Sequence, residues 1–102
     1  MDDLGSVHVI VDDGATRIVL VGEISAVVHQ ELVEAVADAV ATGQTIEIDT
    51  HHVTFIDSAC IAVLAGLANQ NPHKPRLLHV SPTGRFILEA NNHAHLFDIV
   101  DG

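Results

Sequence analysis

The chain has 102 residues, of which 48% are hydrophobic, so it is long enough for one small domain with a single core. Its aromatic content is 3%, with no Trp or Tyr, which excludes an aromatic platform for stacking bases. The net charge of −10, from 14 acidic and 4 basic residues, disfavours nucleic acid and direct binding to anionic membranes. We therefore expect partners that present a basic or mixed face.

The sequence carries no sign of export. Residues 1–5 lack the basic and apolar regions of a signal peptide, and no apolar stretch is long enough to span a bilayer. Cys60 is the single cysteine, so an internal disulfide is excluded. These features predict a cytoplasmic protein whose residues 1–102 form one domain.

The first half of the chain predicts a hairpin followed by a helix. Residues 7–11 and 16–21 are rich in β-branched residues, and Asp-Asp-Gly-Ala between them supplies a turn. Ser25 is the expected cap of a helix that ends at Gly43. The apolar stripe expected to face the core of the protein consists of Val28, Leu32, Ala35, Val36, Ala39 and Val40.

The second half alternates strands with helices. Strands are expected over residues 45–49, 53–56 and 77–80, and residues 97–100 are expected to form a terminal strand or an extended tail. A helix is expected from the Asp57-Ser58 step to about residues 69–72. The sequence Ser-Pro at residues 81–82 predicts a third helix, with Phe86, Ile87 and Ala90 turned inward. This order implies an α/β fold with a mixed sheet, an N-terminal hairpin and helices packed on the sheet.

The Asp57-Ser58 step joins a strand-like run to an apolar helix that is almost uncharged. Asp and Ser are both favoured at helix N-termini, where their side chains accept from free backbone N–H groups. Ser58 is therefore expected to open this helix, either as its cap or as a hydroxyl that can carry a phosphate. A phosphate at that place would meet the positive end of the helix dipole.

The same residues resemble the STAS domain, the family of bacterial anti-sigma factor antagonists. The family's Asp-Ser-Ser-Gly-Leu-Gly-Val-Leu corresponds here to Asp-Ser-Ala-Cys-Ile-Ala-Val-Leu at residues 57–64. Gly-Glu-Ile-Ser at 22–25 is similar to the family's Gly-Glu-Leu-Asp, and Val-Ser-Pro at 80–82 with Phe86 resembles its last strand-to-helix step. The departures are Ser25, Ala59, Cys60 and Ala62, which replace an aspartate, a serine and two glycines.

The resemblance implies a switch based on phosphorylation of Ser58. The unmodified protein would bind an anti-sigma factor with serine kinase activity and free a sigma factor, and a serine phosphatase would reset the switch. The partner would dock on the residues that match the family's binding region, which are Glu23, Ser25, Asp57, Ser58, Ala59 and Ala62. The chain itself needs no cofactor, because ATP belongs to the kinase.

Two other functions stay open. The missing serine and glycines fit a STAS interaction module without a phosphorylation cycle, such as a scaffold or the small cytoplasmic subunit of a lipid-transporting ABC complex. A small-ligand or nucleotide sensor is the more distant alternative.

An enzyme and a metal site are not expected. The sequence has no nucleophile elbow, no phosphate-binding loop with lysine and no Ser-His-Asp context. Eight histidines are present, including His51 and His52 near Asp49 and Asp57, but adjacent residues on a strand point to opposite faces. Cys60 is expected to be a small buried hydrophobic residue.

Overall fold

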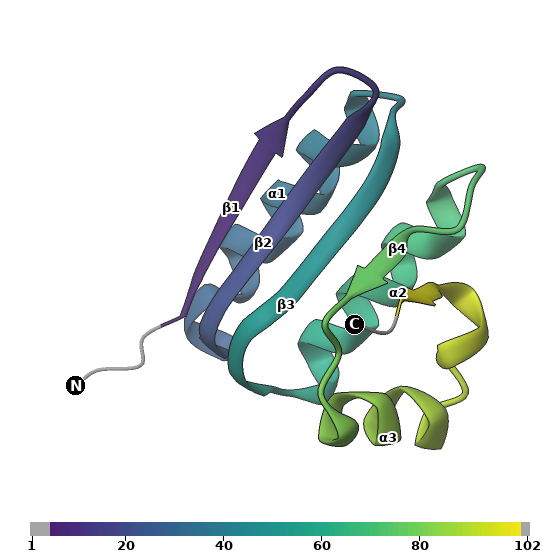
Figure 1. Cartoon of the computed structure of the whole chain (residues 1–102). Helices are drawn as coiled ribbons and strands as arrows, with labels where there is room; N and C mark the ends of the chain where they lie inside the picture. The colour runs from purple at the N-terminus through teal and green to yellow at the C-terminus, as the bar shows by residue number, and fades with distance from the viewer. Residues whose placement is uncertain (1–4, 101–102) are drawn as a thin grey trace.

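The computed structural model describes residues 5–100. The chain folds into an α/β structure with one five-stranded sheet (Figure 1). Its elements in chain order are β1 (Ser6–Val11), β2 (Ala15–Ile24), the 3-10 turn η1 (Ala26–Val28), α1 (His29–Ala41), β3 (Thr45–Ile56), α2 (Ser58–Gln70), β4 (Arg76–Leu78), α3 (Pro82–Ala90), the 3-10 turn η2 (Ala94–Leu96) and β5 (Asp98–Val100).

The sheet is mixed, as predicted. Its spatial order is β1-β2-β3-β4-β5, with β1 antiparallel to β2 and all other neighbours parallel. Helices α1 and α2 cover one face of the sheet, and α3 lies across the end where β3 leads into α2 (Figure 1). Because β2 and β3 are parallel, their carboxyl ends meet at this same end of the molecule.

The N-terminal hairpin confirms the predicted turn. The backbone N–H of Asp12 donates to the carbonyl of Ala15 at 2.9 Å, and Gly14 between them has a φ of +91°. A residue with a side chain adopts such a φ only rarely, which explains the glycine. The turn fixes the register in which Val9 lies opposite Ile18.

Strand β3 is longer than expected. The sequence predicted two short strands over residues 45–49 and 53–56, whereas one strand runs through Thr45–Ile56. The pairing with β2 is irregular between Val19 and Val21 and again between Gly22 and Glu23. These irregularities accommodate additional residues on β3, so pairing continues where a break was predicted.

The start of the first helix also differs from the prediction. A 3-10 turn precedes α1, and the hydroxyl of Ser25 donates to Glu23 Oε2 at 3.1 Å, so it makes no capping hydrogen bond. The predicted stripe nevertheless faces the core: Val28, Leu32, Ala35, Val36 and Ala39 are buried and Val40 is partly buried. Gly43, with a φ of +69°, follows the helix as predicted.

The core is aliphatic, as the composition required. Strands β2 and β3 contribute fully buried isoleucines and leucines, and α2 covers them with Ile61, Leu64 and Leu67. The lone cysteine, Cys60, is also fully buried, which confirms the structural role predicted for it.

The last third of the chain contains two corrections. Strand β4 ends at Leu78, because His79 has a φ of +59° and leaves the extended conformation. In α3, Phe86 is 68% exposed and Ala90 is also exposed, whereas Leu88 is buried and Ile87 is partly buried. The inward positions of Phe86 and Ala90 were therefore predicted wrongly. The helix lies across the end of the fold, so only a narrow stripe of it faces the core (Figure 1).

The start of α3 is as predicted. The hydroxyl of Ser81 accepts from the backbone N–H of Gly84 at 3.0 Å, and Pro82 occupies the first turn. The final strand, β5, pairs with β4 and confirms a strand at the end of the chain.

Two sequence-based expectations are only partly covered by the structure. The prediction that the chain starts without a signal peptide falls mainly on residues 1–4, which lie outside the described residues. Within residues 5–100, no helix is long and apolar enough to cross a membrane.

Candidate functional site

The candidate site lies where β3 leads into α2. The side chain of Asp57 accepts a 2.8 Å hydrogen bond from the backbone N–H of Cys60, so Asp57 caps the helix. Ser58 is the first helical residue and is exposed. Its hydroxyl makes no hydrogen bond to any group within residues 5–100. The prediction that Ser58 caps the helix is therefore wrong. The Ser58 hydroxyl is instead accessible at the helix N-terminus.

The carboxyl end of β2 lies beside this turn. The backbone N–H of Asp57 donates to the carbonyl of Ile24 at 3.1 Å, and the Cys60 thiol donates to the carbonyl of Ser25 at 3.7 Å. These two bonds bring Glu23 and Ser25 to the same end of the molecule as Ser58. The structure thus brings together the segments predicted to bind the partner, although their role stays a prediction.

The face of α2 that begins at Ser58 is formed by small residues. Ala59 and Ala62 are exposed, and Ala62 is one turn after Ser58. A surface of small side chains permits close approach of another backbone. The local charge is negative, since Glu23 is exposed and Asp57 is partly exposed.

Cys60 is buried in the core beneath this site and is not a reactive group. Burial raises the pKa of its thiol to about 12, and the hydrogen bond and the negative charge of Asp57 act in the same direction. The thiol therefore stays protonated at neutral pH and is a poor nucleophile. Its contribution is to fill the space beneath the Ser58 turn.

Asp57 and Ser58 are predicted to contribute differently to stability. Asp57→Ala removes the cap and is expected to lower the free energy of unfolding by about 1 kcal/mol, which is about 4–8 °C in melting temperature for a domain of this size. Ser58→Ala is expected to change it by less than about 0.5 kcal/mol, because no hydrogen bond is lost. Urea and thermal unfolding of both variants measure the difference. The reverse order of effects would identify Ser58 as the cap.

The histidines are arranged differently from the prediction. The rings of His51 and His52 lie 4.7 Å apart, although neighbours on a regular strand face opposite ways, and the ring of His79 lies 4.9 Å from that of His51. The irregular pairing opposite β2 at this point accounts for the difference. Within residues 5–100, no group of three His, Cys, Asp or Glu side chains is arranged to hold a metal ion.

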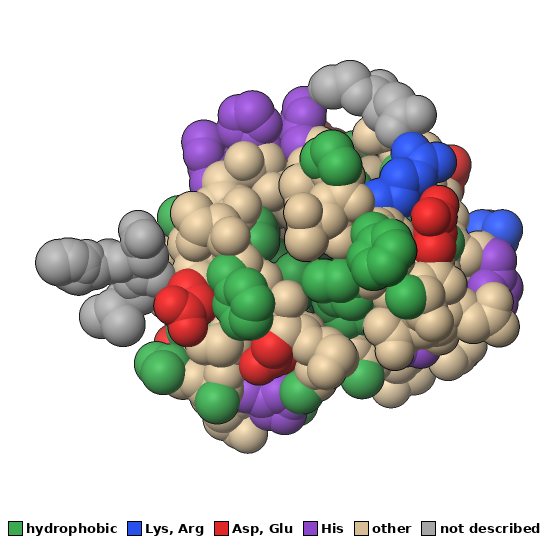
Figure 2. All heavy atoms as spheres, turned by 90° about the horizontal axis from the view of Figure 1, so that it is seen from below, with side chains coloured by type: hydrophobic (Ala, Val, Ile, Leu, Met, Phe, Trp, Pro, Cys, Tyr) green, Lys and Arg blue, Asp and Glu red, His purple; other side chains and the backbone are tan. Residues whose placement is uncertain are grey.

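A hollow lies beside the candidate site, and no pattern in the sequence predicted it. Figure 2 shows this end of the molecule, with apolar side chains gathered around a hollow, acidic side chains on both sides of it and basic side chains next to the acidic ones on one of these sides. Phe55, on β3, is 53% exposed and lines this hollow. A single exposed phenylalanine is ordinary on a protein surface, so the hollow, and not the ring alone, makes this place a candidate for binding.

Solved structures share this fold. An anti-sigma factor antagonist from Mycobacterium paratuberculosis superposes with a TM-score of 0.87 at 21% identity, covering 100% of this chain and 90% of that chain. The anti-sigma factor antagonist SpoIIAA in its unphosphorylated form gives 0.76 at 19% identity, over 95% of this chain and 89% of that chain. The Bacillus cell fate determinant SpoIIAA in its phosphorylated form gives 0.73 at 19% identity, over 94% and 92%.

The sequence comparisons agree with the fold. No curated protein matches the chain. A family model described as "Mlab, STAS domain" matches residues 7–96, which include every strand-to-helix turn described above. The chain therefore belongs to the STAS domain family.

Proposed function

We propose that this protein is an anti-sigma factor antagonist controlled by phosphorylation of Ser58. The observation that carries the proposal is the exposed Ser58 hydroxyl, which makes no hydrogen bond within residues 5–100 and lies at the N-terminus of α2. The similarity in fold to anti-sigma factor antagonists supports the same function. In this proposal residues 1–102 form one STAS domain that acts in the cytoplasm and is not an enzyme.

The unmodified protein binds an anti-sigma factor with serine kinase activity and thereby frees a sigma factor. The docking surface consists of the β2 end and the first turns of α2, namely Glu23, Ser25, Asp57, Ser58, Ala59 and Ala62. The hydrogen bonds that join Asp57 to Ile24 and Cys60 to Ser25 support this grouping, because they tie the two segments into one surface.

Phosphorylation of Ser58 adds close to two negative charges at pH 7. The helix N-terminus tolerates a phosphate, since its free N–H groups and dipole favour an anion. The phosphate does not strengthen binding of the partner at the docking surface, because Asp57 and Glu23 already make that surface acidic. The whole chain also carries a net charge of −10. The modified protein is released, and a serine phosphatase restores the unmodified form.

Mapping of the modified residue tests this proposal. Incubation with ATP and the cognate kinase is expected to add one phosphate, at Ser58, as read by mass spectrometry of the intact protein and of its peptides. Ser58→Ala is the matched variant and is expected to abolish the modification. Labelling that persists in Ser58→Ala, or that maps to Ser25 or Ser81, would refute the assignment.

One observation favours a second candidate, a STAS interaction module without a phosphorylation cycle. Ala59, Cys60 and Ala62 stand where the family pattern has a serine and two glycines. A scaffold, or the cytoplasmic subunit of a lipid-transporting ABC complex, would use the same docking surface with Ser58 unmodified. The mass measurement above separates the two candidates, because only the first predicts a phosphate.

A further inference from the structure

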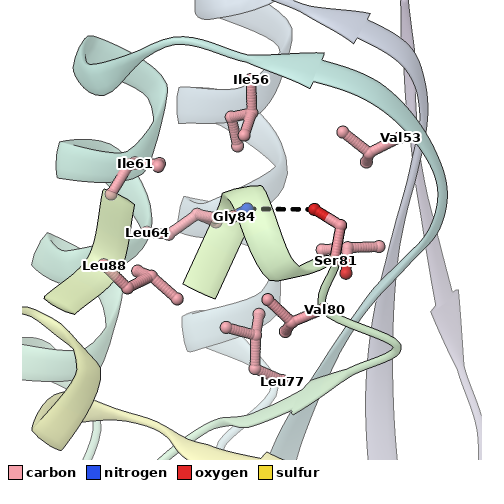
Figure 3. A pocket seen from close by; sticks show the side chains of 10 residues that line it. Val53, Ile56, Ile61, Leu64, Leu77, Val80, Ser81, Gly84 and Leu88 are labelled. Carbon is pink, nitrogen blue, oxygen red and sulfur yellow. Dashed lines mark hydrogen bonds between the residues drawn. The ribbon is translucent and has the colours of Figure 1, made fainter. Parts of the chain in front are cut away.

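A pocket between α2, β3 and α3 is not used by the switch described above. It has a volume of about 40 Å³, and β3 contributes Val53 and Ile56 to its wall. Helix α2 contributes Ile61 and Leu64, and α3 contributes Gly84 and Leu88. Figure 3 shows these side chains arranged around the space, with α3 passing over it. The space exceeds by a few times the roughly 10–15 Å³ that one water needs.

The pocket continues into a second hollow of about 280 Å³ along the end of β3. The two share Val53, Ile56, Ser81 and Gly84, so together they form one groove between β3 and α3. The half-exposed ring of Phe55 lines its outer part. We call this feature the β3–α3 groove.

The polar groups of the inner pocket already have partners. The hydroxyl of Thr50 donates to the carbonyl of Leu78 at 2.8 Å, and Ser81 Oγ accepts from the Gly84 N–H at 3.0 Å. The remaining lining is aliphatic, so a water molecule would find few partners there. The chemistry of the pocket suits one apolar group of the size of a leucine or phenylalanine side chain.

The groove is continuous with residues 56–58, where β3 leads into α2. Ile56 directly precedes Asp57, the cap of α2, and Ile61 lies one turn into the same helix. The hollow opens at the end of the molecule shown in Figure 2. A protein that docks on Ser58 can therefore reach the groove with an adjacent segment.

The charges on this protein indicate which kind of residue flanks the apolar side chain of the partner. None of the residues that line the groove is charged, and Arg85, the nearby cation on α3, lies 3.6 Å from Glu89 in an ion pair. The chain as a whole is strongly acidic, with a net charge of −10. A segment that carries basic residues beside its apolar side chain complements this end of the protein.

We infer that the β3–α3 groove receives one apolar side chain of a basic segment of the anti-sigma factor, as an anchor next to the Ser58 switch. The inference rests on the proposed function, since it assigns a second contact to the same partner. A few side chains buried in well-packed pockets typically carry most of the binding energy of an interface.

The groove is tested first with toluene, which stands in for a phenylalanine anchor side chain. Titration into protein with labelled Ile, Leu and Val methyl groups is expected to shift the methyl signals of Ile56, Ile61, Leu64 and Leu88. Gly84→Leu is expected to abolish these shifts, because a Cβ at Gly84 lies 3.3 Å from Ser81 Oγ and the added side chain occupies the groove. Ala90→Leu is the matched control, since Ala90 is exposed at the far end of α3. Shifts located elsewhere, or unchanged in Gly84→Leu, would overturn the assignment.

The second test measures the affinity for the cognate anti-sigma factor. Gly84→Leu is expected to weaken binding at least tenfold and Ala90→Leu is not. Thr83→Trp covers the groove from its exposed rim and is the second variant should Gly84→Leu unfold. Wild-type affinity in the groove variants together with lost affinity in Ser58→Asp would overturn the groove inference alone. Wild-type affinity in the groove variants and in Ser58→Asp alike would overturn the proposed function as well.

Discussion

Ser58→Asp is expected to lower the affinity for the anti-sigma factor at least tenfold, which is roughly 1.4 kcal/mol, and to leave the melting temperature within a few degrees of wild type. A carboxylate imitates part of the charge of a phosphate and stands beside Asp57 on an acidic surface. The fold accepts it, because a negative group at a helix N-terminus stabilises the helix by about 0.3–1 kcal/mol. Calorimetric titration and thermal unfolding measure the two quantities.

Ser58→Ala is the control for this result. It removes the hydroxyl without adding charge and is expected to keep wild-type affinity and stability. Unfolding of Ser58→Asp would instead make the serine a structural residue. Normal binding by Ser58→Asp would mean that charge at this position does not control the protein.

Ala62→Arg is also expected to weaken binding of the anti-sigma factor at least tenfold. Ala62 is exposed one turn after Ser58, and a long cationic side chain there prevents close approach of the partner. The domain is expected to stay folded, since arginine is a good helix former and the position is open to solvent. Calorimetry gives the affinity, and circular dichroism verifies the fold.

Ala37→Arg is the matched control, because Ala37 is an exposed alanine on α1. It is expected to leave the affinity unchanged. If instead Ala37→Arg weakens binding, or if binding depends on Glu31 and Glu34 on the outer face of α1, the docking surface lies on the first helix and the proposed surface is wrong.

The sequence was sufficient where local chemistry decides the structure. The Asp-Asp-Gly-Ala turn, the four-residue spacing of the α1 stripe and the Ser-Pro start of α3 each specify their element through a few neighbouring residues. The resemblance of residues 57–64 to the STAS pattern supplied the fold, which the family match confirms.

The sequence was insufficient where distant contacts decide. Strand β3 runs without a break because irregular pairing with β2 accommodates its extra residues, and no local pattern reveals that pairing. The orientation of α3 depends on how the helix crosses the end of the sheet, so Phe86 was placed inward although it is 68% exposed. The β3–α3 groove forms because α3, which follows α2 and β4 in the chain, folds back over the end of β3, so no single element predicts it.

The most direct test of the Ser58 switch compares two forms of the same protein. Protein phosphorylated at Ser58 and unmodified protein are titrated in parallel against the cognate anti-sigma factor by calorimetry, with phosphatase treatment of the modified form as the recovery step. A switch at Ser58 requires that phosphorylation weakens binding at least tenfold and that dephosphorylation restores it. Equal affinities of the two forms would contradict it.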